Sequence, residues 1–177
     1  TNTNPKLIGD PQAIKGGSLT LKGDDDFPPT FRGVGQDSRH QILTLLEDNV
    51  YESLLTINTE TMQYQPLLAT HWKVSDDKMT FWFRINPRAQ FSDGMPVTSD
   101  DVIATWDLLM DETILEPSSQ IVYGKFEPFI ESKYIVRVEC KKLSWRNLLY
   151  FGGMSILPAH ILDDIDGSEY LEEYQFK

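Results

Sequence analysis

The sequence has little cysteine, no long apolar run and few basic residues, and each shortage excludes or disfavours a class of protein. Its 177 residues include one cysteine, Cys140, so the chain cannot build an internal disulfide framework or a cysteine-based zinc site. No run of about 18 apolar residues occurs, which disfavours a membrane-spanning helix. Only 16 residues are basic against 27 acidic ones, giving a net charge of −11, and the basic residues form no cluster. We expect no nucleic-acid partner, because binding one requires a positive surface.

What is present predicts a mixed α/β fold. Hydrophobic residues make up 40% of the chain, enough for a buried core. Apolar and polar residues alternate over 79–85 and again over 134–140, as they do in strands with one buried face. Residues 71–74 and 79–85 flank a short polar connection. This pair of segments therefore predicts a β-hairpin.

Helical spacing predicts a helix in the middle of the chain. Thr98 can cap its N-terminus, and the helix runs to about Asp111. Val102, Trp106 and Leu109 form its buried stripe. The remaining expectations are a strand over 18–22, a loop over 23–38, a helix over 41–49, an irregular segment over 112–124, a short helix from Ser144 to Phe151 and a helical turn from Pro158.

The residues that could support catalysis form no recognisable site. His40, His71 and His160 are far apart in the sequence, and none has a partner at the spacing of a metal ligand. Cys140 shares a strand face with apolar residues, which predicts a buried and unreactive thiol. We expect neither an enzyme nor a bound cofactor or metal.

A calcium loop is the one metal motif that the sequence approaches. Asp164, Asp166, Gly167 and Glu173 match positions 3, 5, 6 and 12 of an EF-hand loop. Position 1 must supply a carboxylate, but it is occupied by Leu162. Calcium binding is therefore not expected here.

Aromatic residues gather beside a glycine pair near the C-terminal end. Trp145, Tyr150 and Phe151 precede Gly152 and Gly153. The cluster could pack in the core. Alternatively, it could form a ligand-facing wall, since glycine lets a backbone approach closely. Both interpretations stay open.

An ordered series of short motifs gives the strongest indication of function. The motifs are YESLL (51–55), PLLATHW (66–72), SDDKMTFWFRI (75–85), FSDGMPVTSDDV (91–102) and ILPAHIL (156–162). In this order they resemble extracellular solute-binding protein family 5, the oligopeptide- and dipeptide-type receptors of ABC importers. The resemblance covers roughly residues 18–174.

The resemblance implies an architecture like that of the type II periplasmic binding proteins, in which two hinged lobes enclose the ligand. Family members are much longer, so the chain is expected to be an N-terminal fragment. The expected organisation is a flexible arm (1–16), a first-lobe strand, loop and helix (17–50), a small mixed domain (51–155) and the start of a return to the first lobe (156–177).

The resemblance also implies candidate ligand contacts, because three stretches match family segments that approach the ligand. These are Arg32, Gly33, Val34, Gly35 and Gln36 in a loop, then Tyr123, and finally Phe151, Gly152 and Gly153. No catalytic residue is implied.

The implied function is capture of a peptide between two lobes and its delivery to an ABC permease in the membrane. The implied location is periplasmic or extracytoplasmic, with a lipid anchor on the full-length protein left open. One alternative is a family member for another solute, such as a nickel chelate, haem or an oligosaccharide. From other classes, a hydrolase or an acidic interaction domain also stays open.

Overall fold

The structure is a computed structural model that describes residues 10, 12–14, 16–20, 27–163 and 165–173. Runs of strands and runs of helices follow one another along it. In chain order they are α1 (Gln41–Val50), β1 (Leu55–Ile57), β2 (Tyr64–Pro66), β3 (Ala69–Val74), β4 (Thr80–Ile85), α2 (Ser99–Met110), the 3₁₀ helix η1 (Glu112–Ile114), α3 (Pro117–Tyr123), β5 (Phe126–Ser132), β6 (Ile135–Cys140), α4 (Asn147–Gly152), α5 (Ala159–Leu162) and α6 (Gly167–Glu173).

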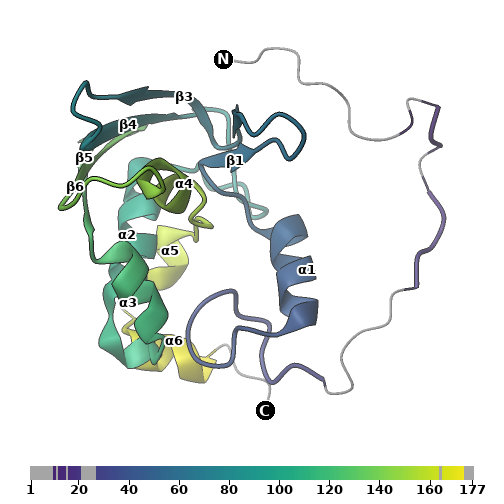
Figure 1. Ribbon diagram of the computed structural model, residues 1–177. Coiled ribbons are helices and arrows are strands. Elements are labelled where there is room, and N and C mark those ends of the chain that lie inside the picture. The colour runs from purple at the N-terminus through teal and green to yellow at the C-terminus, as the bar shows by residue number, and fades with distance from the viewer. Residues whose placement is uncertain (1–9, 11, 15, 21–26, 164, 174–177) are drawn as a thin grey trace.

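A four-stranded antiparallel sheet with strand order β3-β4-β6-β5 lies along the top of the molecule in Figure 1, with the helices below it. The predicted hairpin is confirmed as β3 and β4, and the predicted strand over 134–140 as β6. Phe83 lies opposite Val136, and both side chains are fully buried. Alternation in the sequence therefore gives the buried face of the sheet directly.

The two outer strands of this sheet differ in their sequences. Buried and more exposed residues alternate along β3. β5 carries Pro128 opposite Val138 of β6, the one strand that pairs with it in the described part of the chain. Proline has no backbone N–H, so it is tolerated at the edge of a sheet and not in its centre. A second, two-stranded sheet pairs β1 with β2.

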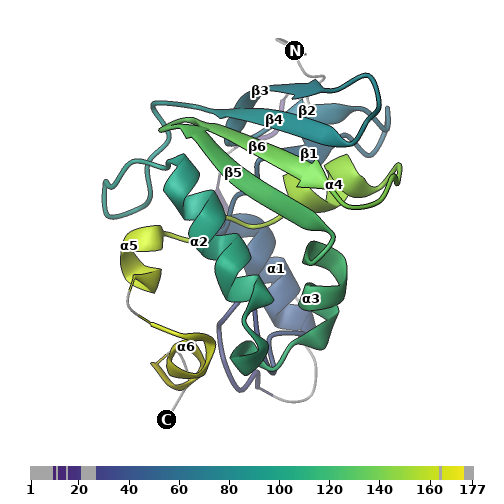
Figure 2. The same cartoon turned by 90° about the vertical axis from the view of Figure 1, so that its left-hand side faces the viewer.

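Helix α2 runs beneath the sheet, with α3 and α5 on opposite sides of it (Figure 2). It begins at Ser99 after the predicted cap, Thr98. The buried carboxylate of Asp101 accepts hydrogen bonds from the Thr98 backbone N–H (2.6 Å) and hydroxyl (3.1 Å). Its other oxygen accepts from the backbone N–H of Ala159 (2.7 Å), which ties the start of α5 to that of α2.

A second, smaller group of buried residues joins the lower end of α2 to the C-terminal helices. Its members are Leu108, Ile114, Leu157, Tyr170 and Leu171. Val34 from the loop before α1 packs against both this group and the main core. Helix α1 stands to one side of the other helices (Figure 1).

The structure corrects the expectation that residues 112–124 are irregular. They form η1 and α3, separated by Leu115, which adopts a left-handed backbone with φ 54°. Pro117 starts α3, where its fixed φ suits a first helical turn. Strand β5 and helix α6 were also not predicted from the sequence.

Two smaller expectations need correction. Residues 18–20 of the predicted N-terminal strand belong to no strand, and residues 21 and 22 lie outside the described residues. The helix predicted from Ser144 begins at Asn147 as α4, after a turn at residues 145–146 in which Ser144 Oγ accepts a hydrogen bond from the Arg146 backbone N–H (3.3 Å). In the described residues, no helix is long and apolar enough to cross a membrane.

Candidate functional site

The loop before α1, residues 30–39, contains the first group of predicted ligand contacts. The side chain of Arg32 folds back within the loop instead of extending into solvent, and Arg32 is only 3% exposed. Its Nε donates to Thr30 Oγ1 (2.9 Å), and its Nη2 donates to the backbone carbonyl of Gln36 (2.9 Å). The loop is therefore shaped by one of its own side chains.

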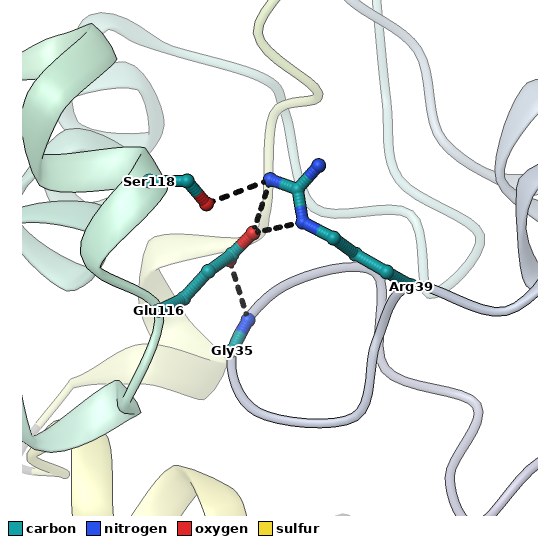
Figure 3. A network of polar contacts seen from close by, with 4 residues as sticks. All are labelled: Gly35, Arg39, Glu116 and Ser118. Carbon is teal, nitrogen blue, oxygen red and sulfur yellow. Dashed lines mark hydrogen bonds and ion pairs between the residues drawn. The ribbon is translucent and has the colours of Figure 1, made fainter.

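A polar network fixes the same loop to the N-terminus of α3 (Figure 3). The buried Glu116 carboxylate accepts from the Gly35 backbone N–H through one oxygen (3.0 Å) and from Arg39 Nη2 through the other (2.7 Å). Arg39 Nη2 also donates to Ser118 Oγ (2.9 Å). The backbone N–H of Gln36 adds a bond to the carbonyl of Ile114 (2.8 Å).

Gly35 is required at the centre of this network. Its φ of +88° lies in a region that side chains rarely adopt. A Cβ atom there would lie 2.8 Å from Leu171 Cδ2 and 3.2 Å from the carbonyl oxygen of Ile114. The loop can therefore approach η1 and α6 this closely only with glycine at this position.

Tyr123 lies at the opposite end of α3 from Glu116. Its backbone carbonyl accepts a hydrogen bond from Trp106 Nε1 (3.2 Å), and its ring centroid is 6.5 Å from that of Phe126. Burial, with a smaller effect of the Glu116 charge, raises the pKa of Tyr123 to about 12. The phenol is therefore neutral at physiological pH and can serve as a hydrogen-bond donor.

The third predicted group lies in the core. The Phe151 ring is fully buried, with centroids 6.0 Å from Phe83 and 5.4 Å from Phe126. Gly152 lets α4 pack on β1, since a Cβ there would lie 3.2 Å from Leu55 Cδ1. Gly153 is exposed and ends the helix. The structure places the aromatic Phe151 in the packing role, and ligand contact by these three residues stays a prediction.

The structure thus links the loop to Tyr123 through α3, and Tyr123 to Phe151 through their common neighbour Phe126. It does not gather them around one cavity: Arg32 and Gly33 line cavities, whereas Tyr123, Phe151, Gly152 and Gly153 line none of the three described below.

The largest of these cavities, about 720 Å³, was not predicted from the sequence. Its lining includes residues from the end of α1 and from helices α5 and α6. In Figure 1, α1 lies on the right, and α5 and α6 lie to its left. Arg32 lines it together with mainly apolar side chains, among them Phe31, Val50, Tyr51, Phe91, Ile161 and Tyr170. The lining residues come from six separate segments of the chain, so no local motif identifies them.

Two further cavities are more polar in their lining. One, of about 360 Å³, lies beside the Glu116 network and is lined by Gly33, Arg39, Thr44 and Glu47, among others. The other, of about 520 Å³, lies between α2 and the α5–α6 segment and has five aspartates in its lining. Two of them are already used in capping: Asp111 accepts from Gly167 N–H (2.8 Å), and Asp166 accepts from Glu169 N–H (2.9 Å).

The described residues also bear on metal binding and on thiol reactivity. No group of three or more His, Cys, Asp or Glu in the described residues could hold a metal ion. Of the calcium-loop residues, Asp164 lies outside the described residues, and Gly167–Glu173 forms α6. Cys140 is buried as predicted, and burial raises its pKa to about 11, so the reactive thiolate is scarce at neutral pH.

Comparisons with known sequences identify relatives along most of the chain. Residues 63–175 match the family model described as "Bacterial extracellular solute-binding proteins, family 5 Middle". Uncharacterized protein YejA of Escherichia coli K12 is 29% identical over 155 residues, 87% of this chain and 25% of its own length. A putative binding protein of Brucella melitensis biotype 1 is 31% identical over 172 residues, 92% of this chain and 28% of its own. The chain thus spans about a quarter of the length of these relatives.

A shorter match is closer in sequence. The peptidoglycan-binding protein YepA of Agrobacterium fabrum is 45% identical over 64 residues, which is 36% of this chain and 10% of YepA.

Solved structures show the same fold. The oligopeptide-binding protein AppA of Bacillus subtilis, in complex with a nonapeptide, superposes with a TM-score of 0.69 at 21% identity, covering 88% of this chain and 30% of AppA. NikZ of Campylobacter jejuni, in complex with Ni(L-His), gives a TM-score of 0.55 at 21% identity, covering 68% of this chain and 24% of NikZ. The expected mixed α/β, periplasmic-binding-protein-like fold is confirmed. The chain belongs to the bacterial extracellular solute-binding proteins of family 5.

Proposed function

We propose that this chain is part of the substrate-binding component of an ABC importer, which captures peptides and delivers them to a membrane permease. The observation that carries this proposal is the family match over residues 63–175, and relatives named as binding proteins support it. The fold shared with a nonapeptide-bound receptor is consistent with a peptide as ligand.

The geometry supports a binding role over a catalytic one. The loop over 30–39 is held in place by Arg32 and by the Glu116 network before any ligand arrives. Pre-formed sites bind more tightly because less conformational entropy is lost on association. The mostly apolar 720 Å³ cavity also lies within the range of about 300–1,000 Å³ that is usual for ligand sites. The protein is accordingly a binding protein and not an enzyme in this proposal.

In the intact receptor the peptide lies extended between two lobes, and its backbone bonds to the protein as an added strand does. Hinge closure around the ligand, known for periplasmic binding proteins, would present one closed surface to the permease. This role requires an extracytoplasmic location. Division of the chain into parts of a first lobe and a small domain of residues 51–155 belongs to the same proposal.

A narrower candidate is a peptide derived from the cell wall. The specific observation in its favour is the 45% identity to a peptidoglycan-binding protein over 64 residues. A solute of another kind is the remaining alternative within the family, because a similar fold also binds Ni(L-His).

Mass spectrometry of co-purified ligand tests these possibilities. The natural protein that contains this chain would be purified from cell extract without denaturation, and its bound small molecules released and identified. We expect linear peptides. Peptides containing D-amino acids would identify the cell-wall candidate, and a metal chelate or sugar would contradict the peptide proposal. Turnover of a co-purified compound by the protein would contradict the binding role itself.

A further inference from the structure

We propose that residues 141–146, which join β6 to α4 and are referred to below as the basic loop, form a contact surface for membranes that contain anionic phospholipids. The proposal goes beyond the proposed function, because it concerns a surface partner of the protein and not the ligand that it captures. In Figure 2 the basic loop lies beside α4 at the right-hand edge of the molecule, on the opposite side from α5.

Positive charge is concentrated at the basic loop although the chain as a whole is acidic. Lys141, Lys142 and Arg146 are all exposed, and no acidic residue occurs over positions 140–162. The fold adds Lys125, which precedes β5, because its backbone carbonyl accepts a hydrogen bond from the Lys141 N–H (2.9 Å). Four of the 16 basic residues therefore lie together in a chain of net charge −11.

Contacts with aromatic rings join these cations into one continuous surface. Lys125 Nζ lies 5.0 Å from the centroid of the Tyr150 ring, and Arg146 Nη1 donates to the Tyr150 hydroxyl (3.4 Å). The Arg146 guanidinium in turn lies 5.0 Å from the centroid of the Trp145 ring. Positive charge and aromatic surface are therefore presented side by side.

Trp145 and Leu143 give this surface its apolar component. Trp145 is 76% exposed and Leu143 is 59% exposed, whereas the other three tryptophans, Trp72, Trp82 and Trp106, are half-buried. Tryptophan is enriched at membrane–water interfaces, and lysine and arginine are attracted to anionic headgroups. An exposed tryptophan among cations is therefore well suited to the headgroup layer of a bilayer.

The shape of the surface favours a bilayer over a small molecule. None of the three cavities described above includes a residue of the basic loop. Small molecules bind in concave sites, whereas a bilayer needs no pocket, because apolar side chains enter the boundary between headgroups and acyl chains.

Acidic residues at the border of this surface limit the strength of the contact. Glu127 and Glu139 lie opposite each other in β5 and β6, two positions along the chain from Lys125 and Lys141, and Glu139 forms an ion pair with Arg137. We therefore expect weak, reversible binding that salt suppresses, because exposed charges are screened beyond about 8–10 Å at physiological ionic strength.

Vesicle binding tests the proposal. The 177-residue chain, and the natural protein that contains it, would be mixed at pH 7 with vesicles of phosphatidylcholine alone or with vesicles in which about a third of the lipid is phosphatidylglycerol. We expect about tenfold more protein to sediment with the anionic vesicles at about 0.05 M salt, and most of it to be released at about 0.5 M. Brominated lipid should quench tryptophan emission on binding, and Trp145→Phe should remove most of that quenching.

Matched variants locate the contact. Lys141→Gln combined with Lys142→Gln should reduce binding to anionic vesicles about fivefold. Glutamine can still donate to the Gly124 carbonyl, which Lys141 Nζ contacts at 2.8 Å, and circular dichroism would check that the variant is folded. Lys78→Gln combined with Arg88→Gln removes the same charge from exposed positions elsewhere and should change binding less than twofold.

Every other result overturns the proposal. Equal binding to both kinds of vesicle, or equal loss in both double variants, would show that the basic loop is not the contact. Binding without quenching of Trp145 would show that its ring does not reach the lipid. Binding by the chain but not by the natural protein would show that the surface is covered there. Binding of a polyglutamate peptide, but of no vesicle, would identify an acidic protein as the partner instead. None of these results changes peptide capture, so the proposed function is tested separately.

Discussion

Apolar side chains around the four-stranded sheet are fully buried, whereas several of those around α1 are exposed. Around the sheet, Phe83, Phe126 and Phe151 have no exposed surface and pack ring against ring. Around α1, by contrast, Phe31 is 46% exposed and Val50 is 68% exposed, and both line the largest cavity. The comparison separates side chains that are fully enclosed and hold the fold together from apolar side chains that keep exposed surface and line a cavity.

The largest loss of stability is expected from a substitution in the core beside the sheet. Phe83→Ala removes a fully buried ring and should lower the free energy of unfolding by about 3–5 kcal/mol. The matched change Phe31→Ala removes a half-exposed ring and should cost less than about 1.5 kcal/mol. Urea unfolding of both variants measures the difference. Equal losses would show that the α1 side contributes as much to stability as the sheet.

A smaller loss is expected from cutting the link between α2 and α5. Asp101→Ala removes an acceptor of three hydrogen bonds and should destabilise the protein by about 2–3 kcal/mol, as charged acceptors do. Thr98→Ala, at the cap position itself, should cost only about 1 kcal/mol. The reverse order in thermal or urea unfolding would mean that the hydroxyl, and not the carboxylate, organises this helix start.

Loosening the loop over residues 30–39 should change the free energy of unfolding only slightly. In Glu116→Gln the amide oxygen can still accept from Gly35 N–H, but the ion pair with the largely exposed Arg39 is lost. Although Glu116 is buried, Arg39 is largely exposed and solvent screens the pair, so the free energy of unfolding should fall by only about 1 kcal/mol. Hydrogen exchange at the Gly35 and Gln36 amides should nevertheless become faster. Unchanged exchange would show that the loop is held by packing alone.

The subtlest expectation concerns alkaline pH. The folded state raises the pKa of Cys140 from 9.0 to about 11, so it binds more protons than the unfolded state between those values. The contribution of this thiol to the free energy of unfolding is therefore fully present below pH 9 and is lost as the pH rises towards 11. Cys140→Ala should flatten this decline in unfolding experiments across that range. Rapid reaction of native Cys140 with a disulfide reagent at pH 8 would contradict the burial on which the prediction depends.

The sequence predicted the parts of this fold that have a local signature. Alternating residues identified β4 and β6, and spacing identified α1 and α2. Strand β5 was missed because Pro128 interrupts its alternation, and α3 because its first turn, Pro117 to Gln120, carries no apolar stripe. In these segments, packing of α3 against α2 and pairing of β5 with β6 determine the structure more than the local sequence preference does.

The candidate site was less predictable than the fold for a physical reason. Family resemblance selected the loop over 30–36, but the partners that fix it, Glu116 and Ile114, are about 80 residues away in the chain. The 720 Å³ cavity likewise combines six segments of the chain, and no motif in any one of them marks it. Long-range contacts of this kind leave no pattern in a single sequence. Only the arginine in an otherwise glycine-rich and apolar loop could have drawn attention beforehand.

The proline in β5 has a consequence for how this protein behaves at high concentration. An outer strand with all its N–H groups free is a template on which a neighbouring molecule can grow a shared sheet. Pro128 withholds a donor at the middle of that strand, and the exposed Glu127 beside it adds negative charge. Crowded copies should therefore repel one another along this border, and self-association through β5 should be suppressed.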